Sequence, residues 1–401
     1  AMVRNRRELN GHVTVESRYY ISSLANEAAT ILKAARSHWG IENSLHWVLD
    51  VAMGEDDSRI RKDHAPENMA LLRRIALSLL KQEKTLKRGV VGKRLKAAMN
   101  PGYLLTVLVT LTTGLALLAY LPGVRKGQGR PLLHIARPAV YATAAGLVAA
   151  SAYLWYLLLG HHFEFDYVFR YSSREMPMRY VFSAFWGGQE GTFLLWALFG
   201  GLLAVMLRFK ARQYEAPVLF FYLGINMFLM LMLLKASPFA RLATTPPDGN
   251  GLNPLLQDPW MTIHPPIMFF GFASLGISAA YAMAALVKED WDNWVRRAVP
   301  WTTFGVMALG TGLLLGGYWA YSILGWGGFW GWDPLENSSL VPWLVAVALL
   351  HNQVIQMKRN IFRRSNVLIA LLPFVLVTYS TFLTRSGVLA DFSVHSFTDL
   401  G

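Results

Sequence analysis

Residues 326–343, which read WGGFWGWDPLENSSLVPW, have the composition best suited to holding a ligand. Four tryptophans and one phenylalanine fall within these eighteen residues, and three glycines separate the aromatic side chains. A flat shelf of indole rings fits a large planar apolar molecule with polar edges, and a porphyrin is such a molecule. Because tryptophan also gathers at membrane boundaries without binding anything, an interfacial aromatic belt is the alternative.

Two histidines lie on either side of this stretch in the sequence. His264 occurs in WMTIHPPIMFF, where we expect the two prolines to end an irregular loop and to start a membrane span. His395 occurs in ADFSVHSFTDL, just beyond the last apolar run. Neutral imidazoles are the usual axial ligands of haem iron, so this pair could ligate one haem from its two faces. The alternative for each histidine is a solvated side chain at the membrane surface.

The composition indicates a membrane protein with a separate basic portion. Of the 401 residues, 54% are hydrophobic, yet the net charge is +13, and residues 1–100 hold 18 of the 38 lysines and arginines. The chain has no cysteine, which excludes disulfides, thiolate metal sites and cysteine nucleophiles. The first apolar run begins only near Leu104, so we expect no cleavable signal peptide.

From that point onward, the sequence contains eight apolar runs close to the ~20 residues that span a bilayer. The runs cover residues 104–121, 139–160, 189–207, 217–235, 267–287, 302–323, 338–357 and 367–384. The loops after the odd-numbered runs hold fourteen lysines and arginines, against six in the loops after the even-numbered runs. Since basic loops stay in the cytoplasm, the tryptophan-rich stretch, His264 and His395 are predicted to face the outer side. The predicted fold is an α-helical polytopic membrane protein of about eight spans with a Trp-rich outer loop, preceded by a small soluble α/β fragment.

Several motifs of this membrane portion resemble a known family. The run from Trp326 to Pro334 resembles the tryptophan-rich "WWD" signature of cytochrome c biogenesis proteins, and WGGQEGTFLLW, IHPPIMFFG and SVHSF are similar to the CcmF/NrfE haem lyases. The resemblance extends from about Gly114 to the end of the sequence. It implies a haem-lyase membrane domain over residues 111–401, with a cytochrome c assembly core at about 180–400. It also implies a bacterial inner-membrane protein whose functional loops face the periplasm.

The resemblance implies an activity on haem. Such a lyase receives haem from a periplasmic haem chaperone and promotes thioether formation with the CxxCH cysteines of an apocytochrome c, alongside thiol-handling maturation proteins. The resemblance implies that Trp326, Trp330 and Trp332 of the tryptophan loop hold the haem ring and that His264 and His395 bind the haem iron.

The family also carries a haem b within the membrane, held by two histidines. His351, inside the seventh apolar run, matches one of those two positions, and an ionisable group within a span indicates function by default. The matching partner would fall beyond Gly401, so we expect this second site to be incomplete.

Three polar residues near these motifs have roles that the sequence leaves open. Asp333 could orient a haem propionate, but the pattern Asp333-Pro334-Leu335-Glu336 is also that of a helix N-cap, which we favour. Glu190 in WGGQEGTF fits the first turn of a helix, where the dipole favours a carboxylate. Arg385, at the outer end of the last run, could pair with a propionate or extend to the membrane surface. Four further tryptophans are interpreted as membrane-interface anchors: Trp186, Trp196, Trp260 and Trp301.

Residues 1–110 resemble a different family. The segment HWGIENSLHWVLDVAMGEDDSRIRKDHAPENMALLRRIALSLL is similar to the C-terminal end of insertion-sequence transposases of the ISAs1 type, which have a DDE-type nuclease core. Glu42 matches the third carboxylate of that family's two-metal site. The two aspartates would lie upstream, so we expect this portion to be inactive and Glu42 to be a surface carboxylate. Local patterns predict a strand in ESRYYISSL and a helix over residues 25–36.

The two resemblances meet within residues 100–114, which predicts a fusion of two unrelated sequences. Other function classes stay open. A haem transporter of the inner membrane is the alternative for the membrane portion, although we find no paired half-repeats with broken helices. A remnant of DNA transposition is the alternative for the N-terminal portion. We interpret its basic run at 81–96 as a solvated helix face and expect no nucleic acid partner.

The orientation of the first span is a testable point. The basic-loop count places residues 1–100 on the outer side, although seven basic residues lie at positions 81–96, and the first span contains Thr106, Thr110, Thr112 and Thr113. We therefore predict that this span inserts poorly or that residues 1–100 stay in the cytoplasm. Because the chain has no cysteine, an Asn10→Cys variant can be treated with an impermeant maleimide in intact cells. We expect no labelling, and labelling from outside would contradict the prediction.

Overall fold

The computed structural model describes residues 2–9, 12–19, 23, 27–84, 87–98, 100–124, 129–324, 328–386 and 388. Contacts within the chain divide it into two compact units, residues 1–99 and residues 100–401. In the second unit, eight helices of the described residues are long and apolar enough to span a membrane, which confirms the predicted number.

The first unit consists of a β-hairpin followed by helices. Its strands β1 (Met2–Leu9) and β2 (His12–Tyr19) pair antiparallel. Its helices are α1 (Ala28–Ile41), the π-helical turns η1 (Glu42–His46) and η2 (Val48–Ala52), α2 (Ala65–Gln82) and α3 (Val90–Ala98). The predicted strand is present in β2, which begins earlier, at His12, and the predicted helix is present in α1, which continues to Ile41. The predicted positions 20–22 and 24–26 lie outside the described residues. Leu49, Ala52 and Leu77 are buried in this unit.

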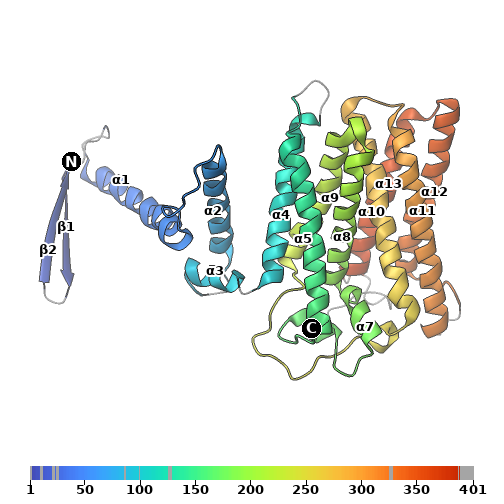
Figure 1. Ribbon diagram of the computed structural model, residues 1–401, viewed down its shortest axis with the longest axis horizontal. Coiled ribbons are helices and arrows are strands. Elements are labelled where there is room, and N and C mark those ends of the chain that lie inside the picture. The colour runs from blue at the N-terminus through green and yellow to red at the C-terminus, as the bar shows by residue number, and fades with distance from the viewer. Residues whose placement is uncertain are drawn as a thin grey trace. The chain divides into compact units, whose positions relative to one another are not determined.

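The second unit is a bundle of eight long helices (Figure 1). These are α4 (Pro101–Tyr120), α5 (Leu133–Leu159), α8 (Gln189–Lys210), α9 (Glu215–Lys235), α10 (Pro259–Lys288), α11 (Trp294–Trp319), α12 (Pro334–Arg359) and α13 (Arg363–Arg385). Short helices occur in the connections: η3 (Leu121–Gly123), α6 (Asp166–Tyr171), α7 (Met178–Ser183), η4 (Ala184–Trp186), η5 (Arg212–Tyr214), η6 (Pro254–Leu256) and η7 (Ala320–Leu324).

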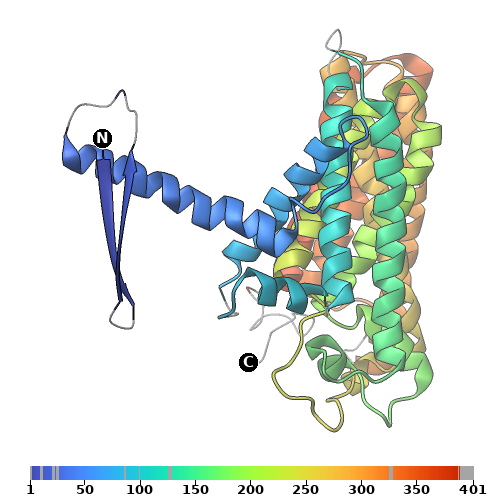
Figure 2. The same ribbon diagram turned by 60° about the vertical axis from the view of Figure 1, so that its left-hand side comes forward.

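The two ends of the bundle differ. The connections 211–214, 289–293 and 360–362 are short turns and gather at one end, which we call the turn end (Figures 1 and 2). The connections 160–188 and 236–258, together with residues 320–324 and 328–333, gather at the other end, which we call the loop end. The basic-loop count predicts that the turn end is cytoplasmic.

Apolar composition explains why these runs are helical. In hydrocarbon, backbone N–H and C=O groups need partners within their own segment, and an α-helix supplies them. The eight spans have mean hydropathies from 1.4 to 2.2. Polar caps then extend some helices beyond the apolar run. The Asn100 side chain accepts a 3.1 Å hydrogen bond from the Tyr103 N–H, and Pro101 occupies the first helical position of α4.

Helix α10 lies at the centre of the bundle and contacts α8, α9, α11 and α13. Its approach to α11 depends on residues without side chains, because small residues let helix backbones come close. A Cβ added at Gly271 would lie 2.9 Å from the backbone nitrogen of Leu309, and one at Gly312 would lie 2.3 Å from the Met268 side chain. The interface between these two helices therefore leaves no room for larger residues at either glycine.

The threonines of α4 are accommodated inside the bundle. The Thr113 hydroxyl donates to the Val109 carbonyl oxygen at 2.7 Å and lies 3.3 Å from the Thr143 hydroxyl of α5. The Thr143 hydroxyl in turn donates to Thr112 at 3.1 Å. Hydroxyls that bond within the helix and to its neighbour can connect spans in an apolar surrounding. These threonines therefore contribute contacts between α4 and α5.

Polar contacts join the helices at the turn end. The Arg137 guanidinium of α5 donates from Nε and Nη2 to the two Glu215 carboxylate oxygens of α9, each at 2.9 Å. The Tyr120 hydroxyl of α4 donates to the same carboxylate at 3.1 Å. Charge-assisted bidentate pairs are among the stronger hydrogen bonds in proteins. This group ties α4, α5 and α9 together.

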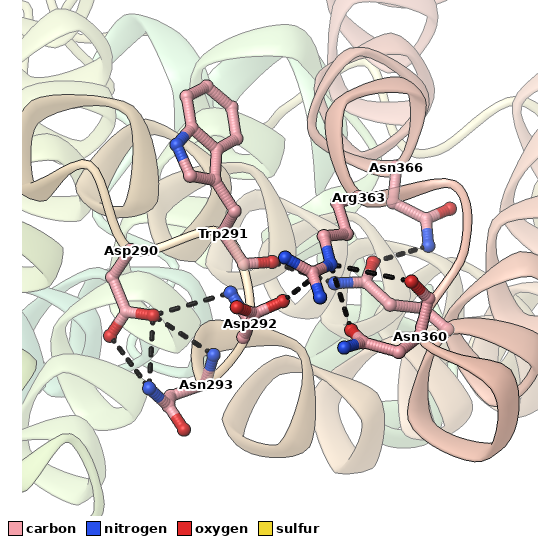
Figure 3. A network of polar contacts seen from close by, with 8 residues as sticks. Asp290, Trp291, Asp292, Asn293, Asn360, Arg363 and Asn366 are labelled. Carbon is pink, nitrogen blue, oxygen red and sulfur yellow. Dashed lines mark hydrogen bonds and ion pairs between the residues drawn. The ribbon is translucent and has the colours of Figure 1, made fainter.

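A second network links the α10–α11 turn to the α12–α13 turn (Figure 3). The Arg363 guanidinium pairs with the Asp292 carboxylate at 2.9 Å, and the Gln356 amide donates to the Trp291 carbonyl at 2.7 Å. The Asn366 amide donates to the Gln356 side-chain oxygen, also at 2.7 Å. Side chains from α12 and α13 thus satisfy backbone and carboxylate groups of the neighbouring turn.

Candidate functional site

The loop end collects most of the residues that the sequence singles out. Residues 160–188, 236–258 and 328–333 cover this end of the bundle (Figures 1 and 2). Helices α8 and α10 begin here, and α11 and α13 end here. The site is therefore built from helix ends and the segments that connect them.

The hydroxyl of Tyr167 fixes the turn that precedes α8. Tyr167 is almost completely buried, and its hydroxyl lies 2.8 Å from the Phe185 carbonyl oxygen, to which it donates. The same hydroxyl accepts from the Gly188 N–H at 3.0 Å. Burial raises the pKa of Tyr167 well above its usual range, so the phenol stays a neutral donor.

The glycines of WGGQEGTF are required by this close packing. A Cβ at Gly188 would lie 2.4 Å from the Tyr171 ring, and a Cβ at Gly191 would lie 1.8 Å from the Phe185 carbonyl oxygen. Neither position has room for any side chain. The motif therefore has a structural role, which is to bring the chain tightly around Tyr167 into the first turn of α8.

A half-buried ion pair secures the same turn. Glu190 lies in the first turn of α8, as predicted, and its carboxylate is 2.7 Å from Nη2 of Arg170 in α6. Arg170 also pairs with Asp166 at 3.0 Å. Burial opposes the charge on Arg170, but the nearby Glu190 carboxylate, with smaller contributions from Tyr171 and Asp166, raises the pKa of Arg170. The pair anchors the 160–188 segment to α8.

Two of the tryptophans interpreted as interface anchors are core residues. Trp186 is 6% exposed and Trp196 is 3% exposed, so the anchor prediction is wrong for both. The Trp196 ring packs against Phe269 and Phe272 of α10 at 5.8 Å, a contact between elements far apart in the sequence.

His264 lies inside a helix, and its prediction as part of an irregular loop is wrong. The Asp258 carboxylate accepts from the Trp260 N–H at 2.8 Å, and Pro259 takes the first helical position. This N-cap starts α10 before His264, so Pro265 and Pro266 fall within the helix. The imidazole is consequently carried by a rigid element rather than by a loop.

The imidazole of His264 stacks on an indole of α11. The ring centroids of His264 and Trp319 are 5.8 Å apart with an angle of 22° between the planes. The Trp319 Nε1–H donates to the Leu255 carbonyl at 3.2 Å, which fixes the indole. A Cβ at Gly316 would lie 3.2 Å from Nδ1 of His264, so this glycine keeps α11 close to the imidazole.

Further aromatic rings surround this pair. Tyr318 of α11 lies edge-on to Trp260 of α10 at 4.8 Å and contacts Phe329 at 5.7 Å. Tyr321 stacks on Phe329 at 5.4 Å. The tryptophan-rich stretch is thereby joined, through Phe329, to the helix ends that carry His264.

The described part of that stretch that precedes α12 presents two indoles of different exposure. Trp332 is 71% exposed, and its ring lies 6.4 Å from that of Trp330 at an angle of 86°. The Trp330 Nε1 is buried and has no hydrogen-bond partner among the residues that the structure describes. Buried indole N–H groups usually have an acceptor, so this donor fits a ligand oxygen.

The capping arrangement predicted at Asp333 is present in the half that Glu336 supplies. The Glu336 carboxylate accepts from the Asp333 N–H at 3.2 Å and from the Gly331 N–H at 2.9 Å. This is the reciprocal half of a capping box, with Pro334 as the first residue of α12. The cap fixes the point within the tryptophan-rich stretch at which α12 begins.

His351 lies in α12 with an exposed side chain. Its Nδ1 is 2.8 Å from the Val347 carbonyl oxygen. Because a carbonyl only accepts, Nδ1 is the donor of this contact, and in a neutral imidazole Nε2 then keeps its lone pair, as in many metal-binding histidines. From the helix rise, His351 lies about 25 Å along α12 from its loop-end start, whereas His264 lies only about 8 Å along α10 from its start.

The other predicted residues have different surroundings. The Arg385 Nη2 donates to the Thr192 hydroxyl of α8 at 3.0 Å, so Arg385 turns toward the bundle rather than to the membrane surface. Glu42 is exposed at the start of η1. Trp326 and His395 lie outside the described residues. Among the described residues, no group of three or more His, Asp or Glu side chains could hold a metal ion.

Comparison with known proteins decides the family. The Cytochrome C assembly protein family model matches residues 186–389, and the Transposase DDE domain model matches residues 2–79. The chain belongs to the cytochrome c assembly protein family. Both resemblances found in the sequence are therefore confirmed, and the N-terminal portion carries a transposase-type domain.

Individual proteins of the cytochrome c assembly family are also similar to this chain. The cytochrome c-type biogenesis protein CcmF of Pseudomonas aeruginosa is 41% identical over 69% of this chain and 43% of its own length. CcmF of Escherichia coli is 37% identical over 72% of this chain and 46% of its own length. A solved structure of the cytochrome c haem lyase CcmF is 33% identical with a TM-score of 0.64, covering 72% of this chain and 47% of that one. The chain thus spans less than half the length of these relatives and shares their multi-pass membrane fold.

Sequence reasoning missed three residues of the candidate site at the loop end. Tyr167 and Arg170 were not considered, although the glycines of WGGQEGTF signal that something packs closely against them. Trp319 was also missed, because its contact with His264 depends on the register of α11 against α10. The single available signal was its place at the end of an apolar run.

The stability of the loop-end turn around Asp248 should depend on pH. The Arg174 and Gly249 N–H groups donate to its carboxylate at 3.0 and 2.7 Å, which lowers the pKa of Asp248 below 3.8. A depressed pKa stabilises the folded state above pH 3.8 and ceases to do so as the pH falls through the folded pKa. We predict that the protection factor of the Arg174 amide, which is its intrinsic exchange rate divided by the observed rate, falls over that acidic window. Asp248→Asn should remove this pH dependence, and an unchanged profile in that variant would contradict the assignment.

Proposed function

We propose that the membrane unit binds haem at its loop end and passes it to an apocytochrome c. The observation that carries the proposal is the stacking of His264 on Trp319, 5.8 Å apart, at the end of the bundle where the tryptophan-rich stretch lies. On this proposal the loop end faces the periplasm of a bacterium, and the spans cross its inner membrane. The basic-loop count supports that orientation.

The residues present fit a haem. His264 supplies an imidazole on a rigid helix, and His395, outside the described residues, would supply the second axial ligand. The buried Trp330 Nε1–H would donate to an oxygen at the edge of the ring. Trp332 and, outside the described residues, Trp326 would complete the aromatic shelf, and the backbone N–H of Asp333 is held by the Glu336 carboxylate. Haem would bring the reactive vinyl groups, whereas the protein supplies position and orientation.

His351 would belong to a second haem b site within the membrane. Its Nδ1 bond to the Val347 carbonyl orients the ring and leaves Nε2 for iron, the arrangement expected of a haem ligand. Its exposed side chain needs an imidazole from outside the described residues to complete such a site.

The chemistry proposed for the loop end is one of alignment. The substrate, a CxxCH segment of apocytochrome c, brings its own thiols, and the absence of cysteine in this chain avoids mixed disulfides. Residues on helices, such as His264, would hold the haem in one orientation for the incoming thiols, and such positioning would remove much of the entropic cost of the reaction. A periplasmic haem chaperone would deliver the haem, and thiol-handling maturation proteins would keep the cysteines reduced.

We predict that replacing His264 removes most of the bound haem. The chain would be purified in detergent from cells that make the cytochrome c maturation proteins, and haem per polypeptide would be measured from the absorption spectrum. His264→Ala and His395→Ala should each lower the haem content by about tenfold or more, because each removes an axial ligand. His351→Ala should keep the haem of the loop end.

His134→Ala is the matched control, because His134 is exposed at the start of α5 near the turn end. It should leave the haem content unchanged, and all variants should elute as single species from size-exclusion chromatography. Haem that persists in His264→Ala, or no haem in any sample, would overturn the proposal.

A further inference from the structure

A crevice between α8, α9 and α13 opens on the outside of the bundle. Its volume is about 330 Å³, within the range of small-molecule sites. Phe193 and Trp196 line it from α8, Phe228 from α9, and Phe374 and Phe382 from α13. Phe228 and Phe382 are more than half exposed, so the crevice opens where membrane lipid would lie.

The polar groups of this crevice concentrate at its loop end. Arg385, Ser386 and Gln189 line that end. The Arg385 guanidinium is held in place by its 3.0 Å bond to the Thr192 hydroxyl and lies 5.8 Å from the Phe193 ring. Two threonines of α13 that line the crevice further from the loop end bond to their own helix. The Thr378 hydroxyl donates to the Val375 carbonyl at 2.7 Å, and the Thr381 hydroxyl donates to the Val377 carbonyl at 2.8 Å. They present no free donor to an occupant.

The length of the crevice matches one leaflet of a bilayer. Arg385 and Phe374 are eleven residues apart on α13, which corresponds to about 16 Å of helix. Half of a ~30 Å hydrocarbon core is about 15 Å. A molecule with its head at Arg385 and its tail beside Phe374 would therefore reach from the membrane surface to the bilayer centre.

We propose that this crevice binds one anionic phospholipid, with the phosphate at Arg385 and an acyl chain along the aromatic walls. A cation at one end of an apolar crevice open to lipid is complementary to an anionic head on an apolar tail. The lipid would fill the space between α8, α9 and α13 beside the ion pair that orders the 160–188 segment. This site is separate from the stacked His264–Trp319 pair and does not depend on haem binding.

The test uses the full chain in nanodiscs of phosphatidylglycerol and phosphatidylcholine with the same acyl chains. Native mass spectrometry of the released protein measures which lipid stays bound. We expect one retained phosphatidylglycerol, favoured over phosphatidylcholine by about five- to tenfold. Equal retention of the two lipids by the unchanged chain would overturn the proposal.

Two variants separate the head from the tail. Arg385→Gln should bring the preference to within about twofold, because it removes the cation that contacts the phosphate. Thr378→Trp adds bulk at an exposed position of the crevice and should reduce retention of both lipids while Arg385 stays in place. The second variant also tests the proposal if the first one fails to fold.

Arg179→Gln is the matched control, because Arg179 is an exposed arginine in α7 at the same end of the bundle. It should leave the lipid preference unchanged. The haem content of Arg385→Gln discriminates the role left open by the sequence. If Arg385→Gln loses haem and keeps the lipid preference, Arg385 pairs with a haem propionate and the lipid site is refuted.

Discussion

Close packing around α10 is the constraint on which the membrane unit depends. In hydrocarbon there is little hydrophobic gain in bringing helices together, so contact must come from fit and from internal polar bonds. Gly271 and Gly312 allow α10 and α11 to touch at backbone distance. The same interface continues to the loop end, where Gly316 keeps α11 beside the His264 imidazole. Close contact at glycines thus brings α10 and α11 together and also positions the candidate iron ligand His264.

Polar residues act mainly where helices end. Arg137 and Glu215 at the turn end, and Arg170 and Glu190 at the loop end, pair side chains from different helices. At the loop end, the Tyr167 hydroxyl and the Glu336 carboxylate also accept hydrogen bonds from backbone N–H groups. Because these groups are satisfied inside the protein, the segments at the loop end can be ordered without a core of their own. A site for a planar ligand needs such order, since alignment is what the proposed reaction requires.

Features that depend on local sequence were predictable, and features that depend on packing were not. The eight spans follow from hydropathy, and short motifs at helix starts predict both the capping arrangement of Asp333 and Glu336 and the place of Glu190 in the first turn of α8. The start of α10 was misplaced because the two prolines outweighed Asp258, whose carboxylate is the actual cap. The burial of Trp196 and the stacking of His264 on Trp319 join residues from different helices, and a single sequence carries no record of such contacts. The candidate site was therefore predicted by residue type, whereas its partners were not.

The central claim is that the loop end fixes haem iron between two imidazoles, one of them on α10. The most direct measurement is the electron paramagnetic resonance spectrum of the ferric haem bound to the His351→Ala chain, in which only the loop-end site contributes. The account predicts a low-spin signal typical of two nitrogen axial ligands. A high-spin, five-coordinate signal would contradict it, because it would mean that His264 and His395 do not hold the iron together.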